Sequence, residues 1–171
     1  MPCPGERQAL STPDPSATRD AAAVRFPPPL VPLIAIAAGV LIDLAGWPLA
    51  VPAPGWVRYG GGGLLILLGI GAMIAAIGLF RRTGQDPKPW ESTPEIVSTG
   101  IYRFTRNPMY LGMGLLQAGI GVVLANLWIV LFVPISWLVI FWIAIRHEEA
   151  YLESKFGETY LRYKQRVRRW L

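Results

Sequence analysis

Two clusters of polar and aromatic residues contain the side chains of this chain that could do chemistry. The first cluster spans residues 102–110 and the second spans residues 146–151, with a long uncharged stretch between them. Their candidate ligand-binding residues are Tyr102, Arg103, Arg106, Asn107 and Tyr110 in the first cluster, and Arg146, His147, Glu148, Glu149 and Tyr151 in the second. Together they offer guanidinium groups, carboxylates, an imidazole, an amide and phenols.

This combination suits a ligand that contains a zwitterionic amino acid. A forked guanidinium binds a carboxylate in two places, and a glutamate binds an ammonium group. The rings of Tyr102, Tyr110 and Tyr151 offer aromatic faces for a sulfonium cation or a purine, and the Asn107 amide can bind a polar edge. S-adenosylmethionine has all of these features, so we expect it as the cofactor.

The apolar stretch between the clusters has to bring them together. Residues 107–145 contain no formal charge. As one helix these residues would be about 58 Å long, nearly twice the roughly 30 Å core of a bilayer. The chain must therefore fold back, and Ala125-Asn126 is the best turn between spans Pro108–Leu124 and Leu127–Ile145. We expect such a hairpin to place the two clusters within about one helix diameter.

Two more apolar segments precede this hairpin. They are Leu30–Gly46 and Val57–Phe80, and the second is rich in glycine and alanine, as close helix packing in membranes requires. Residues 1–29 are rich in proline and polar groups, which predicts a disordered tail, and residues 30–171 form one transmembrane domain. We therefore predict an all-α integral membrane protein with about four transmembrane helices and a C-terminal amphipathic cytoplasmic helix.

Composition supports the membrane assignment. Of the 171 residues, 53% are hydrophobic and only 16% are charged, against about 25% charged in a soluble domain. The net charge of +5 lies beside apolar segments, which favours membrane lipids as partners over nucleic acid. The single Cys3 gives no indication of redox compartment. We expect no metal site.

The distribution of basic residues predicts the orientation in the membrane. The loops near Val51 and Asn126 contain no Lys or Arg, whereas residues 81–106 and 146–171 are rich in both. The positive-inside rule then places both termini and the long middle loop in the cytoplasm, and we expect a bacterial inner membrane. The two clusters would lie on the same side.

Three motifs follow one another within residues 94–171, the expected cofactor-binding part: Gly100–Gly112, Arg146–Glu149 and Phe156–Tyr160. By these motifs the chain resembles the superfamily of isoprenylcysteine carboxyl methyltransferases and phospholipid methyltransferases. It implies a cytoplasmic S-adenosylmethionine pocket, capped by the C-terminal segment and open sideways to lipid. The resemblance places the following residues in that pocket: Arg106, Asn107, Tyr110, Gly112, Gly114, His147, Glu148 and Glu149.

The resemblance also implies methyl transfer to a lipophilic or prenylated substrate. Arg106, His147, Glu148 and Glu149 are the candidate catalytic residues. A carboxylate acceptor is already ionised and needs no base, whereas an amine must first lose a proton to His147 or a glutamate. An isoprenylcysteine-like carboxylate is the first hypothesis and a phospholipid amine the second, and no residue decides between them.

Other interpretations of the same residues remain open. Glu148 and Glu149 can be a solvated helix start, and Arg103 and Arg106 can simply bind lipid phosphates. The chain would then be a non-catalytic lipid-binding membrane module; a reductase is a poorer alternative. The tail predicts one amphipathic helix with a stripe that can serve as a pocket lid or lie on the headgroups: Leu152, Phe156, Tyr160, Tyr163 and Val167. The glycine-rich faces permit self-association, and Gln117 predicts a helix–helix hydrogen bond.

Overall fold

The computed structural model describes residues 26–82 and 95–170, and this part of the chain is helical apart from loops and one isolated bridge. The predicted all-α class is confirmed for these residues. Most of the predicted disordered tail, residues 1–25, lies outside them. In order, the elements are α1 (Leu30–Leu44), α2 (Gly55–Arg82), η2 (Gly100–Arg103), α3 (Pro108–Val123), α4 (Leu127–Ile140), η3 (Phe141–Ile145), α5 (Arg146–Phe156) and α6 (Glu158–Arg166).

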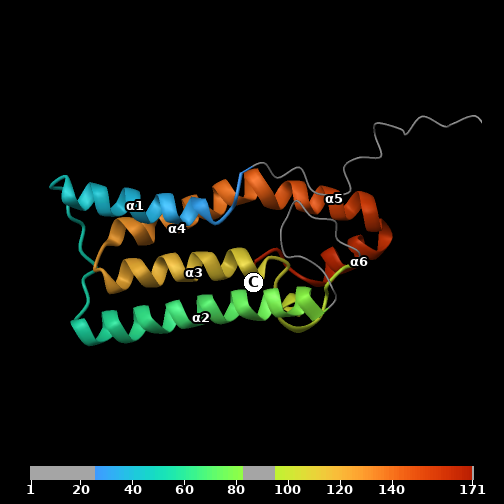
Figure 1. Ribbon diagram of the computed structural model, residues 1–171, viewed down its shortest axis with the longest axis horizontal. Helices are drawn as coiled ribbons and strands as arrows, with labels where there is room; N and C mark the ends of the chain where they lie inside the picture. Colours follow the sequence, from blue (N-terminus) through green and yellow to red (C-terminus); the bar gives the residue numbers. More distant parts are fainter. Residues whose placement is uncertain (1–25, 83–94, 171) are drawn as a thin grey trace, which may run out of the picture.

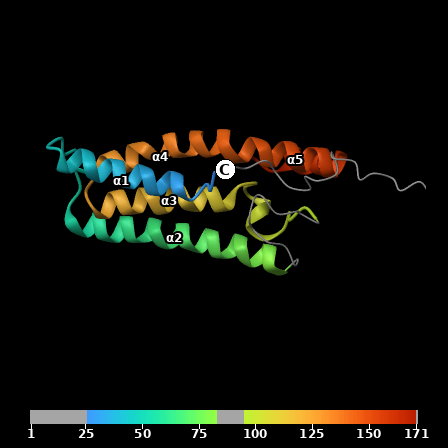
Figure 2. The same cartoon turned by 45° about the horizontal axis from the view of Figure 1, so that its top comes forward.

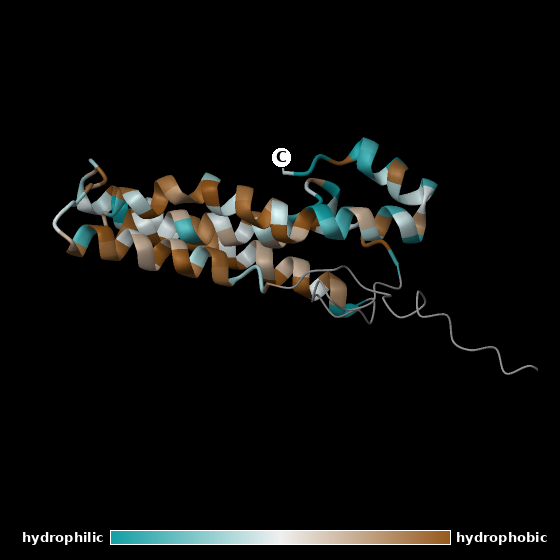
Figure 3. Ribbon diagram, turned by 90° about the horizontal axis from the view of Figure 1, so that it is seen from above, coloured by the Kyte–Doolittle hydropathy of each residue, from teal (hydrophilic) through white to brown (hydrophobic). Residues whose placement is uncertain are grey.

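Helices α1 to α4 run side by side along the long axis of the molecule (Figures 1 and 2). Helix α3 packs most extensively against α2 and also against α4, and α1 packs on α4. Helices α5 and α6 extend beyond the bundle at one end, where α2 ends and α3 begins (Figure 1). Most hydrophilic segments of the described chain gather at that end, as the hydropathy colouring shows (Figure 3), whereas Asp43 and Arg58 lie near the opposite end.

Two helices are long and apolar enough to cross a membrane. One is α2; the other runs without interruption from Leu127 to Phe156 and includes α4, η3 and α5. Only 11% of the most apolar window of α2 is buried by the rest of the protein, which is unlike the core helix of a soluble domain. Helices α1 and α3 have 15 and 16 residues, about 22–24 Å, so four complete spans stay a prediction.

Glycines allow α2 and α3 to approach closely. A Cβ atom on Gly69 would lie 2.6 Å from the Gly112 carbonyl oxygen, and one on Gly119 would lie 2.7 Å from that of Gly62. Such close contact between backbones increases the dispersion attraction between the two helices and is typical of helix association in membranes. The packing expected of this glycine-rich segment is confirmed at Gly69, whereas Gly71 is exposed and has open space around its Cβ position.

The hairpin turn lies where the apolar length predicted it. Ala125 has a φ of 56°, and Asn126 accepts a hydrogen bond from the Ile129 amide at 3.2 Å, which caps α4. The Asn126 amide group also donates to the Gly39 carbonyl at 2.9 Å, which ties the turn to α1. The predicted helix–helix bond of Gln117 is confirmed too, because its side chain donates to the carbonyl of Ile129 on α4 at 3.0 Å.

The predicted single tail helix is wrong in one respect. Gly157 has a φ of 51° and a ψ of −126°, and it separates α5 from α6. Glycine reaches this backbone region without steric cost, so the chain turns sharply there. Helix α5 continues straight from the apolar hairpin, and α6 returns toward the bundle (Figure 1). The expected stripe from Leu152 to Val167 is therefore divided between two helices.

Candidate functional site

A buried carboxylate joins the two polar clusters. Glu149 on α5 accepts a forked pair of hydrogen bonds from Arg169, with Nε 2.9 Å from Oε1 and Nη2 2.8 Å from Oε2. Arg106, in the loop before α3, places its Nη1 3.2 Å from the same Oε1. The Glu149 and Arg106 side chains are only 11% and 9% exposed. The prediction that the hairpin brings the clusters together is thus confirmed, and an ion-pair network marks where they meet.

The C-terminal segment after α6 closes over the loop that holds Arg106. The Arg168 carbonyl accepts a hydrogen bond from the Arg106 amide at 3.0 Å. The Arg169 carbonyl accepts one from the Thr105 hydroxyl at 3.1 Å and one from the Asn107 amide group at 3.0 Å. Backbone carbonyls therefore determine this docking, and Figure 1 shows the segment after α6 beside the start of α3.

An aromatic stack fastens the same segment to the bundle. The rings of Trp170 and Trp137 lie 5.3 Å apart at 30° to each other. The Trp137 indole nitrogen donates to the Tyr110 carbonyl at 3.1 Å, and the ring lies directly on Gly114, whose Cβ position is 2.3 Å from that nitrogen. Glycine at 114 is required for this contact, because any side chain would displace the indole.

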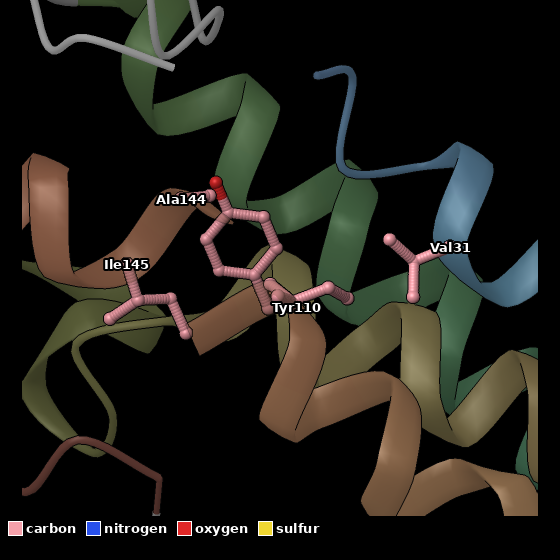
Figure 4. Close-up of a cluster of buried hydrophobic side chains, with 5 residues drawn as sticks. Val31, Tyr110, Ala144 and Ile145 are labelled. Atoms are coloured by element: carbon pink, nitrogen blue, oxygen red, sulfur yellow. The ribbon is translucent and has the colours of Figure 1, made fainter. Parts of the chain in front are cut away.

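A second carboxylate faces the inner side of the site. Glu148 accepts a hydrogen bond from the hydroxyl of Tyr110 on α3. The Tyr110 ring is 5% exposed and belongs to a buried cluster with Val31, Ala144 and Ile145 (Figure 4). Adjacent residues of α5 therefore have different partners: Glu148 meets a phenol from inside the bundle, and Glu149 meets two guanidinium groups from the loop and the tail.

Three tyrosines hold α6 against the loop. Tyr163 donates its hydroxyl hydrogen to the Tyr102 carbonyl at 2.9 Å, and Arg106 donates to the Tyr160 hydroxyl at 3.5 Å. Burial raises the pKa of Tyr102, Tyr160 and Tyr163 above that of an ordinary phenol. All three are therefore neutral at physiological pH, and the site gains no negative charge from them.

A π-turn immediately precedes the second cluster. Residues Phe141–Ile145 form η3, and α5 begins at the next residue. A π-turn inserts one extra residue into a helical turn, so every later side chain is rotated relative to a regular helix, and such turns are frequent at functional sites. Nothing in the apolar run Phe-Trp-Ile-Ala-Ile marks it, so sequence reasoning missed this feature.

Of the predicted site residues, Arg106 and Glu149 belong to the Arg106–Glu149–Arg169 network, whereas Arg103, Arg146, His147 and Tyr151 have other surroundings. Arg103 and Arg146 are exposed and lie over the rings of their own neighbours, Phe104 and Trp142. His147 is half-buried and makes no hydrogen bond or ion pair in the part of the chain that the structure describes. Tyr151 accepts a hydrogen bond from Lys155 at 3.0 Å and packs against the cluster of Figure 4.

The two glycines predicted for the cofactor pocket pack against neighbouring helices. Gly112 lies against the α2 backbone, with its Cβ position 2.7 Å from the Gly69 oxygen, and Gly114 receives Trp137. Sequence reasoning also missed Arg169, Thr105 and Trp170 as site residues. Arg169 is one of several basic residues in the tail, and no spacing rule connects a C-terminal arginine to a glutamate twenty positions earlier.

The site fits the amino-acid part of S-adenosylmethionine. The Nε atom of Arg106 is buried and has no hydrogen-bond partner among the described residues. A buried donor without a partner costs about 1–3 kcal/mol, and a ligand carboxylate would satisfy it. The carboxylates of Glu148 and Glu149 lie on the adjoining helix, where an ammonium group could bind, and Tyr110 is beside them.

Comparison with known proteins agrees with the resemblance to methyltransferases seen in the sequence motifs. A family model described as phospholipid methyltransferase matches residues 57–159, which is more than half of the chain. A protein of Haemophilus influenzae, named only as uncharacterized, is 48% identical over 67 residues, covering 37% of this chain and all of that protein. No solved structure matches the chain.

Two further relatives have informative names. A protein-S-isoprenylcysteine O-methyltransferase of Saccharomyces cerevisiae is 38% identical over 78 residues, which is 45% of this chain and 32% of the relative. Protein-S-isoprenylcysteine O-methyltransferase B of Arabidopsis thaliana is 35% identical over 78 residues, which is 45% of this chain and 39% of the relative. The chain thus spans about a third of the length of these named relatives.

Proposed function

Because this chain belongs to the phospholipid methyltransferase family, we propose that it transfers a methyl group from S-adenosylmethionine to a lipophilic substrate. The observation that supports this most directly is the buried Arg106–Glu149–Arg169 network, in which one guanidinium nitrogen of Arg106 lacks a partner among the described residues. Most buried donors in native proteins are paired, so this open position supports binding of an acceptor such as a ligand carboxylate.

The residues that would hold the cofactor come from three segments. The proposed contacts are Arg106 with the carboxylate, and Glu148 and Glu149 with the ammonium group. Asn107 and Tyr110 would contact the remaining polar and cationic parts, as the family resemblance implies. The cofactor supplies a methyl group on a sulfonium, which is already a good leaving group.

The protein then mainly has to align the reactants and exclude water. The C-terminal segment is suited to this, because its carbonyls bind Thr105 to Asn107 and its Trp170 stacks on the bundle. Arg169 binds Glu149 in a fork, so closing of the segment and orientation of the carboxylate are coupled. Arg106 is held from the other side by Tyr160. We expect the site to open sideways to lipid, as the family resemblance implies.

We propose an isoprenylcysteine-like carboxylate as the methyl acceptor, because the named relatives are protein-S-isoprenylcysteine O-methyltransferases. Such a carboxylate is already ionised and needs no base. The second candidate is a phospholipid amine, favoured by the description of the matching family model. For an amine, His147 or Glu148 would accept the proton.

The proposed setting is a bacterial inner membrane, with the site and both termini on the cytoplasmic side. The two long apolar helices and their exposed surfaces support embedding in lipid. The five exposed large apolar residues of the helix from Leu127 to Phe156 support a lipid-facing surface: Leu131, Ile135, Leu138, Val139 and Trp142. Self-association through the glycine-rich face of α2 remains a proposal.

Binding of S-adenosylhomocysteine, measured by calorimetry on the purified protein in detergent, tests the cofactor. We expect saturable binding by the wild type and at least about a 30-fold loss in Glu149→Gln, because removing one partner of a buried charge pair costs about 2–5 kcal/mol. Glu153→Gln on the same helix is the matched control, since Glu153 pairs with Lys164 at the surface. Absence of saturable wild-type binding, or equal affinities of both variants, would contradict the proposed site.

Transfer of a radiolabelled methyl group to membrane extracts tests the acceptor. Label that is released by mild base indicates an ester and supports the carboxylate. Label that survives base indicates an amine and replaces the first candidate with the second. A preparation of Glu149→Gln run in parallel should transfer little label of either kind.

A further inference from the structure

A basic cleft lies on the other side of the loop that holds Arg106. It has a volume of about 600 Å³, which is in the range of small-molecule sites. Its walls are the segment around η2 and one face of α6. The residues that line it are Ile96, Ser98, Arg103, Thr159, Arg162, Tyr163, Arg166 and Val167.

Three of these eight residues are arginines, and none is acidic. Arg162 and Arg166 are four positions apart on α6 and therefore project from the same face. Arg103 comes from the opposite wall, at the end of η2. Within the described residues none of the three arginines forms an ion pair, so no described carboxylate neutralises their positive charges.

Like charges that converge without counter-charges repel one another, and a bound anion would relieve this repulsion. The geometry points to a binding site for a phosphate group. Guanidinium groups bind phosphate oxygens in pairs, and the hydroxyls of Ser98 and Thr159 in the lining add two further donors. The walls do not depend on the ligand, because the Tyr163 hydroxyl binds the Tyr102 carbonyl at 2.9 Å and fixes α6 to η2.

The position of the cleft identifies the source of the phosphate. Arg103 lies five residues before α3, at the end of the bundle where the apolar helices give way to polar ones (Figure 3). Its neighbour Phe104 is 68% exposed, as an aromatic residue at a membrane interface would be. The lining also includes apolar Ile96 and Val167. We propose that this cleft binds the phosphate headgroup of an anionic phospholipid from the surrounding leaflet.

This lipid would act on the candidate site through α6. Tyr163 and Arg162 face the cleft, whereas Tyr160 on the same helix receives a hydrogen bond from Arg106. Val167 at the end of the cleft leads directly into Arg168 and Arg169, whose carbonyls bind the loop. A headgroup between Arg103 and α6 would therefore stabilise the docked C-terminal segment, whatever reaction the site performs.

The retention of lipid by the purified protein tests the proposal without any methyl-transfer assay. The full-length protein is placed in nanodiscs of phosphatidylcholine with increasing phosphatidylglycerol, and retained lipids are counted by native mass spectrometry alongside the melting temperature. We expect preferential retention of one phosphatidylglycerol and a rise in melting temperature. Removing the arginines by Arg162→Gln/Arg166→Gln should lower the apparent affinity about fivefold per arginine, since each basic residue near an anionic surface contributes about that factor.

The matched control is Arg81→Gln/Arg82→Gln, which removes the same charge at the exposed end of α2, outside the cleft lining. It should keep the preference, and an equal loss in this control would show general surface attraction and overturn the site. Arg162→Lys/Arg166→Lys keeps the charge but loses the paired guanidinium contacts, so its affinity should lie between those of the wild type and the glutamine variant. This variant covers the case in which the glutamine variant does not fold, and a wild-type affinity in it would overturn the paired contacts.

Soluble probes separate the lipid from free phosphate. Inorganic phosphate and glycerol phosphate, added to phosphatidylcholine nanodiscs at physiological salt, should leave the melting temperature unchanged. If they raise it as much as phosphatidylglycerol does, the cleft is a site for soluble phosphate and the lipid assignment is refuted. Equal retention of phosphatidylglycerol and phosphatidylcholine refutes the anion site altogether, while leaving the proposed methyl transfer unaffected.

Discussion

Replacement of Glu149 by glutamine removes the only negative charge that Arg106 and Arg169 contact in the described structure. Gln has nearly the same shape and keeps one acceptor oxygen, so packing is preserved while the charge is lost. Arg106 has a side chain that is only 9% exposed, and it would be left with an uncompensated buried charge. The variant therefore tests whether this network stabilises the fold.

The magnitude follows from burial. Removing one partner from a buried ion pair costs about 3–5 kcal/mol, and the retained acceptor oxygen points to the lower end, about 3 kcal/mol. Arg169 is 36% exposed, so its pair with Glu149 is partly screened and adds about 1 kcal/mol or less. For a chain of this size, about 3 kcal/mol corresponds to a fall in melting temperature of roughly 6–12 °C.

The assay is thermal unfolding in detergent, followed by intrinsic tryptophan fluorescence, with Glu153→Gln as the matched control. Glu153 lies on the same helix and forms an ion pair of 3.1 Å with Lys164, but these side chains are 44% and 36% exposed. Such a surface pair contributes about 0–1 kcal/mol, so the control should fall by less than about 4 °C. Equal small shifts in both variants would refute the reasoning from burial.

A double variant separates charge from shape. Arg106→Gln combined with Glu149→Gln removes both buried charges, so the second substitution should cost less than it does alone. Additive losses would show that the two side chains do not interact across their 3.2 Å contact.

Three further outcomes are expected, each measured as a change in melting temperature or ligand affinity. Gly114→Ala should destabilise the protein by about 1–3 kcal/mol because the new methyl group meets the Trp137 ring. Gly71→Ala, which has open space around it, should leave the stability unchanged or raise it by up to about 1 kcal/mol. A loss of stability in both variants would contradict this packing. Asn126→Ala should cost about 1–2 kcal/mol through loss of the α4 cap, whereas an unchanged melting temperature would show that the turn does not depend on it. Trp170→Ala should weaken S-adenosylhomocysteine binding by releasing the C-terminal segment, and Trp170→Phe should restore part of the affinity; if alanine and phenylalanine behave alike, the stack has no such role.

Much of the fold was predictable because it depends on lengths and periodicities. An uncharged stretch too long for one bilayer crossing had to turn, and Asn126 at the turn supplies the cap for α4. The predicted meeting of the two clusters followed from that turn alone. The division of the tail at Gly157 was less accessible, since glycine permits a break in a helix without requiring one.

The sequence by itself determined that the chain is helical, that its apolar segments pack through small residues, and that arginines and glutamates meet at one end. The tertiary structure decided which of them pair. Consecutive side chains on a helix point about 100° apart, so Glu148 faces Tyr110 while Glu149 faces Arg106 and Arg169, directly after the π-helical turn at Phe141–Ile145. The tail docks through the backbone carbonyls of residues 168 and 169. Every residue has a backbone carbonyl, so no side-chain pattern in the sequence could predict this docking.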